Sequence, residues 1–74
     1  MQEIISILED IKPGIDYTAP HNLLEEGILD SLSIVILAGR LADAFDIQIS
    51  PLQIVPENFD SVQHLAAMVE ALED

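Results

Sequence analysis

One serine of this sequence, Ser31, stands where its hydroxyl could carry chemistry. It directly follows Asp30, at the point where a loop runs into an apolar helical pattern. A serine at a helix start is exposed, and the free N–H groups and dipole of the first turn favour an attached phosphate. The Asp30 carboxylate could assist a phosphoryl transfer, because Mg²⁺ prefers carboxylate and phosphate oxygens. The pair therefore suits a phosphodiester, although Asp and Ser are also common helix caps.

The other side chains with chemical potential do not form a site in the sequence. His21 and His64 lie far apart without metal-ligand spacing, and we expect His64 to be solvated on the outer face of a helix. Glu25 and Glu26 are adjacent in a loop and are expected to be solvated. The chain has no cysteine, so it has neither a disulfide nor a thiolate nucleophile. We predict no catalytic residue and no metal site.

The element before Ser31 is expected to be a helix followed by a long loop. The helix has one apolar stripe, formed by Ile4, Ile7, Leu8 and Ile11. Pro13 and Gly14 end it, and residues 13–30 show no sustained period. A loop of this length in a compact domain is often functional. Four apolar side chains should hold it against the core: Leu23, Leu24, Ile28 and Leu29.

The helix that begins near Ser31 should end at Phe45 and is apolar on two sides. Its predicted core side comprises Ile34, Leu37, Ala38, Leu41, Ala44 and Phe45. Its opposite face comprises Leu32, Val35, Ile36, Gly39 and Ala42, with Arg40 and Asp43 at the edges. So small a chain has little material to cover a helix on both sides, which favours a partner on the second face. We predict partner contacts from Leu32, Val35, Ile36 and Gly39, with Asp30, Arg40 and Asp43 at the rim; Val35 and Ala42 could instead serve the core.

The remainder should hold a short helical turn and a last helix. Residues 46–60 have five candidate core anchors: Ile47, Ile49, Leu52, Ile54 and Phe59. The last helix should begin near Asp60 and Ser61, where Asp60 and Gln63 resemble a capping box. Its predicted inner face comprises Val62, Leu65, Ala66, Val69 and Leu72. The pattern predicts an all-α fold: a small antiparallel bundle of three main helices plus a short helix, with residues 1–74 as one domain.

Composition narrows the class of function. The 74 residues include 14 acidic and two basic side chains, for a net charge of −12. This charge argues against nucleic acid or an anionic membrane as partner, and favours a basic docking surface. No apolar run is long enough for membrane insertion, and the N-terminus does not resemble a signal peptide, so we expect a cytoplasmic monomer. The core is too thin to enclose a substrate pocket, which argues against an enzyme.

Residues 27–32, Gly-Ile-Leu-Asp-Ser-Leu, resemble the signature of acyl carrier proteins, and the likeness extends over nearly the whole chain. The resemblance implies the acyl-carrier-protein fold, with 4′-phosphopantetheine attached to Ser31 by a separate Mg²⁺-dependent phosphopantetheinyl transferase. Cargo would be held as a thioester on the thiol of that arm. The implied partners are an adenylating ligase or acyl synthase that loads the carrier, and an acyl-accepting transferase that unloads it.

Within that family the likeness is greatest to D-alanyl carrier proteins. Residues 25–31 resemble their Glu-Glu-Gly-Leu-Leu-Asp-Ser run, and residues 59–61 resemble the aromatic-Asp-Thr before their last helix. Fatty-acid carriers have many acidic residues on the exposed face of the second helix, whereas here Asp43 is the main acid. Two alternatives stay open: a fatty-acid or polyketide carrier, and an acidic helical adaptor without a prosthetic group.

Overall fold

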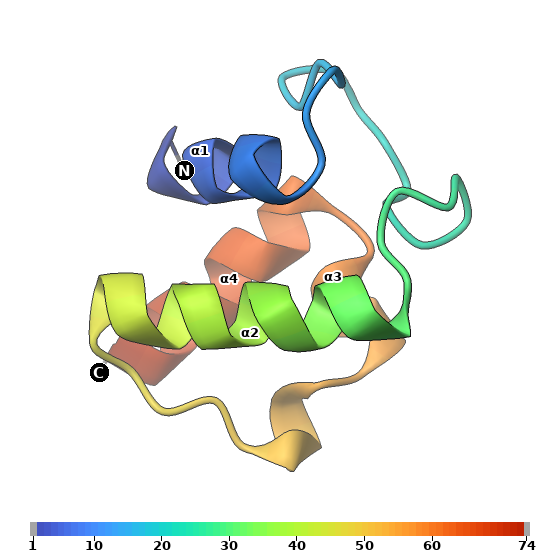
Figure 1. The fold of residues 1–74 in the computed structure, drawn as a ribbon. Helices are drawn as coiled ribbons and strands as arrows, with labels where there is room; N and C mark the ends of the chain where they lie inside the picture. The colour runs from blue at the N-terminus through green and yellow to red at the C-terminus, as the bar shows by residue number, and fades with distance from the viewer. Residues whose placement is uncertain (1, 74) are drawn as a thin grey trace.

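Helices supply the regular structure of residues 2–73, the part of the chain that the computed structural model describes. The elements in chain order are α1 (Gln2–Ile11), α2 (Ser31–Phe45), the 3₁₀ turn η1 (Pro51–Gln53), α3 (Pro56–Phe59) and α4 (Val62–Glu73). Helices α1 and α2 lie side by side and run in opposite directions, while α4 crosses obliquely behind α2 (Figure 1). The predicted all-α fold with three main helices is confirmed.

Helix α1 packs on the core through the predicted stripe. Ile4, Ile7 and Leu8 are buried, and Ile11 packs partly buried against them. The chain then turns into the long loop, where Tyr17 is also buried and donates a hydrogen bond from its hydroxyl to the Lys12 carbonyl oxygen at 2.7 Å. Tyr17 therefore fixes the start of the loop, a role that its isolated position in the sequence did not indicate.

Helix α2 has the predicted bounds and a narrower core face than predicted. It ends where Asp46 adopts the left-handed conformation, with φ of 54°, a common way to stop a helix. Leu37, Ala38 and Leu41 are buried. The prediction that Ala44 belongs to the core was wrong, because Ala44 is exposed and the larger Phe45 packs against the core at this end of the helix.

The segment between α2 and α4 contains two short turns, η1 and α3, where one was predicted. Ile47 and Phe59 are buried as expected, and Ile49 packs partly buried against the core. The prediction that Leu52 and Ile54 anchor this segment was wrong, because both are exposed. A capping box of Ser50 and Gln53 holds η1 through local hydrogen bonds, and none of its three residues is buried.

Helix α4 begins one residue after its cap. The Ser61 hydroxyl oxygen accepts a hydrogen bond from the His64 backbone N–H at 3.0 Å, whereas the Asp60 carboxylate contacts the His64 ring. The predicted capping box of Asp60 and Gln63 was therefore wrong, since Ser61 holds the first turn. The inner face is as predicted, with Val62, Leu65 and Val69 buried and Ala66 and Leu72 partly buried, and Met68 joins it.

The core draws on every main helix and on the long loop. All buried side chains of residues 2–73 are hydrophobic, and those with the least exposure are Phe59, Ile4, Leu8, Leu23, Leu37, Leu41 and Leu65. None of the helices in this range has the length and apolar character needed to cross a bilayer.

The candidate site at the start of helix α2

Asp30 is the residue that caps α2. It has an extended backbone, and its Oδ1 accepts a hydrogen bond from the Ser33 N–H at 2.8 Å. This hydrogen bond from Ser33 lowers the pKa of the Asp30 carboxyl, so the group is ionised over a wider pH range. Either Asp30 or Ser31 could have been the cap from the sequence. Because Asp30 takes that role, the exposed Ser31 hydroxyl is not needed to hold the helix.

The loop before Asp30 is anchored to the core on both sides of a turn. Leu23, Ile28 and Leu29 are buried, and the Leu29 N–H donates to the Leu23 carbonyl oxygen at 2.9 Å. The Leu23 N–H in turn donates to the Asp60 carbonyl oxygen at 2.7 Å, which joins the loop to the start of α4. These predicted anchors therefore fix the backbone immediately before Asp30 and Ser31.

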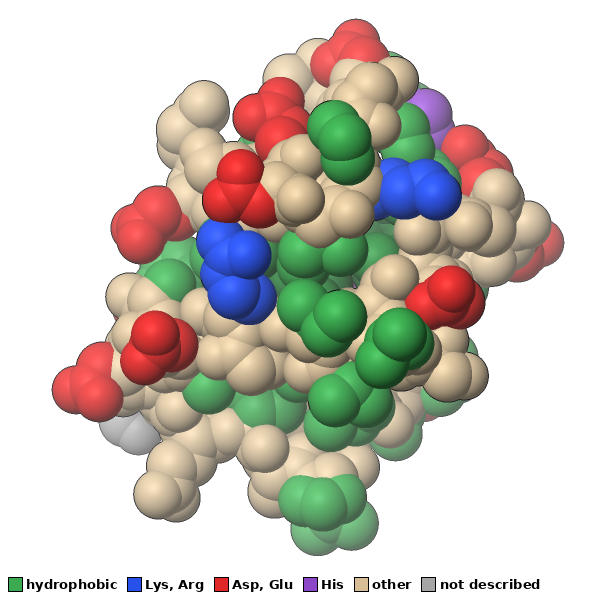
Figure 2. All heavy atoms as spheres, viewed as in Figure 1, with side chains coloured by type: hydrophobic (Ala, Val, Ile, Leu, Met, Phe, Trp, Pro, Cys, Tyr) green, Lys and Arg blue, Asp and Glu red, His purple; other side chains and the backbone are tan. Residues whose placement is uncertain are grey.

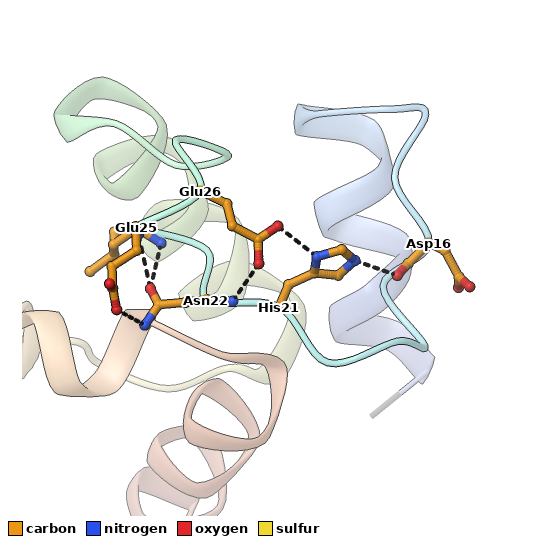
Figure 3. Close-up of polar contacts among 6 residues, drawn as sticks. Asp16, His21, Asn22, Glu25 and Glu26 are labelled. Carbon is orange, nitrogen blue, oxygen red and sulfur yellow. Dashed lines mark hydrogen bonds and ion pairs between the residues drawn. The ribbon is translucent and has the colours of Figure 1, made fainter.

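A network of polar contacts organises the same loop (Figure 3). The Asn22 side-chain oxygen accepts from the Glu25 backbone N–H at 2.9 Å, and its amide nitrogen donates to the Glu25 carboxylate at 2.9 Å. The Glu26 carboxylate contacts the His21 ring and accepts from the Asn22 backbone N–H. Glu25 and Glu26 are exposed as predicted, but they are hydrogen-bonded parts of the loop rather than merely solvated charges.

The exposed side of α2 carries an apolar strip, formed by Leu32, Val35 and Ile36. Leu32 is 69% exposed and Val35 is 63% exposed. The alternative prediction that Val35 packs in the core is therefore wrong. Figure 2 shows hydrophobic side chains gathered over α2 on this face of the molecule. Gly39 is also exposed, and a Cβ added there would meet nothing within 4 Å, so packing does not require a glycine.

The remaining predicted face residues lie in different surroundings. Asp43 is exposed, and Ala42 is half-buried. Arg40 is paired with Asp10 of α1, its Nη2 lying 2.9 Å from Asp10 Oδ2. Leu32, Val35 and Ile36 thus lie together on the exposed side of α2. The Arg40 guanidinium is instead paired with a residue of α1.

Sequence reasoning missed two apolar residues of this exposed surface. Leu52 of η1 is 84% exposed, and Ile54, just after it, is also exposed. A hydrophobic side chain protrudes over the η1 region in the same view as the apolar strip (Figure 2). The sequence held no signal for their exposure, because this segment has no helical or strand period from which an outward face could be predicted.

The surroundings of Ser31 fit an attached phosphodiester. Its hydroxyl is exposed at the first residue of a 15-residue helix, whose N-terminal amides and dipole favour negative charge. The carboxylate of Asp30 is turned to the Ser33 N–H, where it holds the helix end. The fold and this site define a small helical protein that presents one serine next to an apolar surface.

Comparison with known proteins identifies the family. Residues 2–69 match the family model described as a phosphopantetheine attachment site. The chain is 32% identical over 72 residues to the D-alanyl carrier protein of Lactococcus lactis subsp. lactis strain IL1403, and 33% identical to that of subsp. cremoris strain MG1363. Each match covers 97% of this chain and 86% of the relative. The chain belongs to the phosphopantetheine-attachment family, and it is a carrier protein rather than an enzyme.

Membership of this family implies a 4′-phosphopantetheine prosthetic group and an interaction with the transferase that attaches it. When bound, the group supplies a thiol that holds cargo as a thioester. Enzymes that load the carrier and enzymes that accept its cargo are the other implied partners.

Proposed function

We propose that Ser31 is the phosphopantetheine attachment residue and that the carrier holds a D-alanyl group. The attachment site is proposed because Ser31 is exposed at the start of α2 and its hydroxyl is not needed as a helix cap. Asp30 supplies the cap instead. Ser33 is the other serine of this helix, and it is half-buried in the first turn. Attachment at Ser31 therefore places the arm outside the helix, where separate enzymes can reach its thiol.

The nature of the cargo is supported by two independent features. Relatives that cover 97% of the chain are D-alanyl carrier proteins. In addition, the exposed face of α2 bears Leu32, Val35 and Ile36 rather than a row of acids. That surface suits a loading enzyme with an apolar docking site, and differs from the acid-rich helix that fatty-acid synthases recognise. An adenylating ligase specific for D-alanine is the proposed loading partner, and an acyl-accepting transferase the unloading partner.

We assign partner contact to the apolar strip with Gly39 beside it and Asp30, Arg40 and Asp43 at the rim. Leu52 and Ile54 extend this assignment to η1 and the residue after it, because both are exposed apolar residues, with exposed fractions of 84% and 37%. Burial of such side chains by a partner contributes about 25 cal/mol per Å² of apolar surface. The acidic remainder of the molecule favours partners with basic residues around that apolar centre.

The attachment site is tested by intact-mass spectrometry. The protein is incubated with coenzyme A, Mg²⁺ and a broad-specificity phosphopantetheinyl transferase, and a mass gain of one phosphopantetheine is expected. Ser31→Ala should show no gain, whereas Ser33→Ala, the matched control in the same helical turn, should be modified like the wild type. Modification of Ser31→Ala would refute the attachment site, and a folded wild-type protein that stays unmodified would refute the carrier function.

The cargo is tested separately on the modified protein. Incubation with ATP and a D-alanine-activating ligase should produce a thioester adduct of one alanyl group, released by hydroxylamine. L-Alanine with the same ligase, and malonyl or fatty acyl donors with an acyl synthase, serve as competing substrates. Preferential loading of a fatty acyl group would leave Ser31 as the attachment site and replace the D-alanyl assignment.

A further inference from the structure

The ring of His21 lies between two hydrogen-bond acceptors (Figure 3). Its Nδ1 is 2.8 Å from Glu26 Oε1, and its Nε2 is 3.0 Å from the Asp16 carbonyl oxygen. A carboxylate and a carbonyl can only accept hydrogen bonds, and a neutral imidazole can donate from only one nitrogen. Both contacts are therefore hydrogen bonds only when His21 is an imidazolium.

The charged groups around the ring favour that form. The hydrogen bond with Glu26 is the main cause of the raised pKa of His21, and the Asp16 carbonyl and carboxylate add to it. The same pairing lowers the pKa of Glu26. The Asp16 carboxylate points away from the ring and is bonded to Thr18, which lowers its pKa as well (Figure 3). Both nearby carboxylates are therefore ionised when the histidine gains its proton.

The two contacts join separate parts of the loop. Glu26 belongs to a turn in which its N–H donates to the Asn22 carbonyl oxygen at 3.0 Å and its Oε2 accepts from the Asn22 N–H at 2.9 Å. Asp16 lies on the other side of the ring, next to the buried Tyr17. The imidazolium thus connects residues 16–21 to the turn of residues 22–27, which leads directly to Asp30 and Ser31.

We propose that His21 is a pH-dependent clasp of this loop: its imidazolium holds residues 16–21 against the turn of residues 22–27, and loss of one ring proton releases one of the two contacts. The clasp is complete below the unfolded-state pKa of histidine, about 6.5, and above the range in which Glu26 takes up a proton. It opens as the pH rises through the raised pKa of His21.

Opening is expected to be local. Leu23 is fully buried, and its N–H is bonded to the Asp60 carbonyl oxygen at 2.7 Å. Its anchorage does not depend on the histidine. The loop should therefore loosen around Asn22 and Glu26 while the attachment of Leu23 to the start of α4 persists.

The experiment is an NMR titration of the ¹⁵N-labelled full chain between about pH 5 and pH 9, the range that brackets histidine ionisation. Ring ¹⁵N shifts at the acidic end should show both His21 nitrogens protonated. The amide protection factors of Asn22 and Glu26 should fall about two- to fivefold through the His21 transition, as expected for loss of an exposed ion pair. The protection of Leu23 should not follow that transition.

Two variants and one matched control distinguish the clasp from a general pH effect. His21→Gln should abolish the pH response of Asn22 and Glu26, and Glu26→Gln should lower the pKa of His21. His64→Gln removes the other histidine, which also lies beside a carboxylate, and should leave the loop response intact. A single protonated nitrogen on His21 at the acidic end, or a loop response that persists in His21→Gln, would overturn the proposal.

Discussion

Arg40 of α2 and Asp10 of α1 form an ion pair, with Arg40 Nη2 2.9 Å from Asp10 Oδ2. The sequence places these residues 30 positions apart, and the pair joins the two helices that pack side by side. Arg40 is one of only two basic side chains in a chain with a net charge of −12. One of the two lysine and arginine side chains is therefore engaged in an ion pair within the protein.

This ion pair should contribute little to stability, because its side chains are 46% and 68% exposed and water screens the charges. A double-mutant cycle with Arg40→Gln and Asp10→Asn, measured by urea unfolding, should give a coupling free energy of about 0–1 kcal/mol. A coupling well above that range would mean that the pair positions α1 on α2 and is more than a surface contact.

Asp30 and Ser31 have different roles, so their alanine substitutions should have different effects. Asp30→Ala removes the side chain that accepts from Ser33 and should lower the thermal midpoint by about 4–8 °C. Ser31→Ala should leave the midpoint nearly unchanged while preventing phosphopantetheine attachment. Circular dichroism of the two unmodified variants checks this, and a larger loss in Ser31→Ala would show that Ser31 contributes to the cap.

The capping carboxylate also predicts a pH dependence. The pKa of Asp30 is lowered below its ordinary 3.8 in the folded chain, so its stabilising contribution is present above that value and is lost as the pH falls through the lowered pKa. Asp30→Asn keeps a good cap residue that does not titrate. The stability difference between wild type and Asp30→Asn, measured by urea unfolding at several acidic pH values, should shift in favour of the variant as the pH falls.

Gly39 predicts a stabilising substitution. It lies in the interior of α2, where glycine is about 0.5–1 kcal/mol less favourable than alanine, and an added Cβ would meet nothing within 4 Å apart from the backbone of its own helix and its chain neighbours. Gly39→Ala should raise the free energy of unfolding by about that amount. If partner enzymes approach closely at Gly39, the same variant should load more slowly than the wild type, and unchanged loading would remove Gly39 from the proposed partner face.

Alanine substitutions of a buried and an exposed leucine should differ in their effect on stability. Leu41 is fully buried and Leu52 is 84% exposed. Leu41→Ala should cost about 2–5 kcal/mol, a large fraction of the stability of a small domain, whereas Leu52→Ala should change it by less than about 0.5 kcal/mol. Chemical denaturation of the two variants tests this, and a large loss in Leu52→Ala would mean that η1 packs more closely than the structure shows.

The elements that could be predicted from the sequence are those set by local chemistry. The start of α2 follows from an Asp-Ser pair before an apolar period, and its end at Phe45 follows from the loss of that period. A helix cap at Asp30 or Ser31 could be predicted for the same reason, because capping involves residues within one turn. The prediction that Ser31 is the attachment residue came instead from the resemblance of residues 27–32 to acyl carrier proteins. Only the choice between the two residues as cap required the structure.

Burial outside regular helices could not be predicted in the same way. Leu52 and Ile54 are large and hydrophobic, as Ile47 and Phe59 are, yet only the latter pair is buried. In a segment without a period, the residue type does not say which side chains meet a neighbouring helix. The prediction for Ala44 was wrong for a related reason. A helical period tells which side of the helix a residue lies on, but it does not tell whether other atoms cover that side in the last turn.

The contacts of His21 were beyond sequence reasoning because they join residues of an irregular loop. Glu26 lies five residues after His21, and Asp16 lies five residues before it. No helical or strand period relates these positions. The turn around Asn22 and Glu26, anchored through the buried Leu23, is what brings them together in the folded chain.

Helix α2 buries only Leu37, Ala38 and Leu41 of its fifteen residues. Leu32, Val35 and Ile36 can thus be replaced without opening a cavity, as can Leu52 on the neighbouring turn. The proposed partner surface and the packed core therefore use separate sets of positions on the same helix. If that surface binds the partner enzymes as proposed, substitutions confined to it can change which enzymes the carrier meets and leave the packing beneath the start of α2 unchanged.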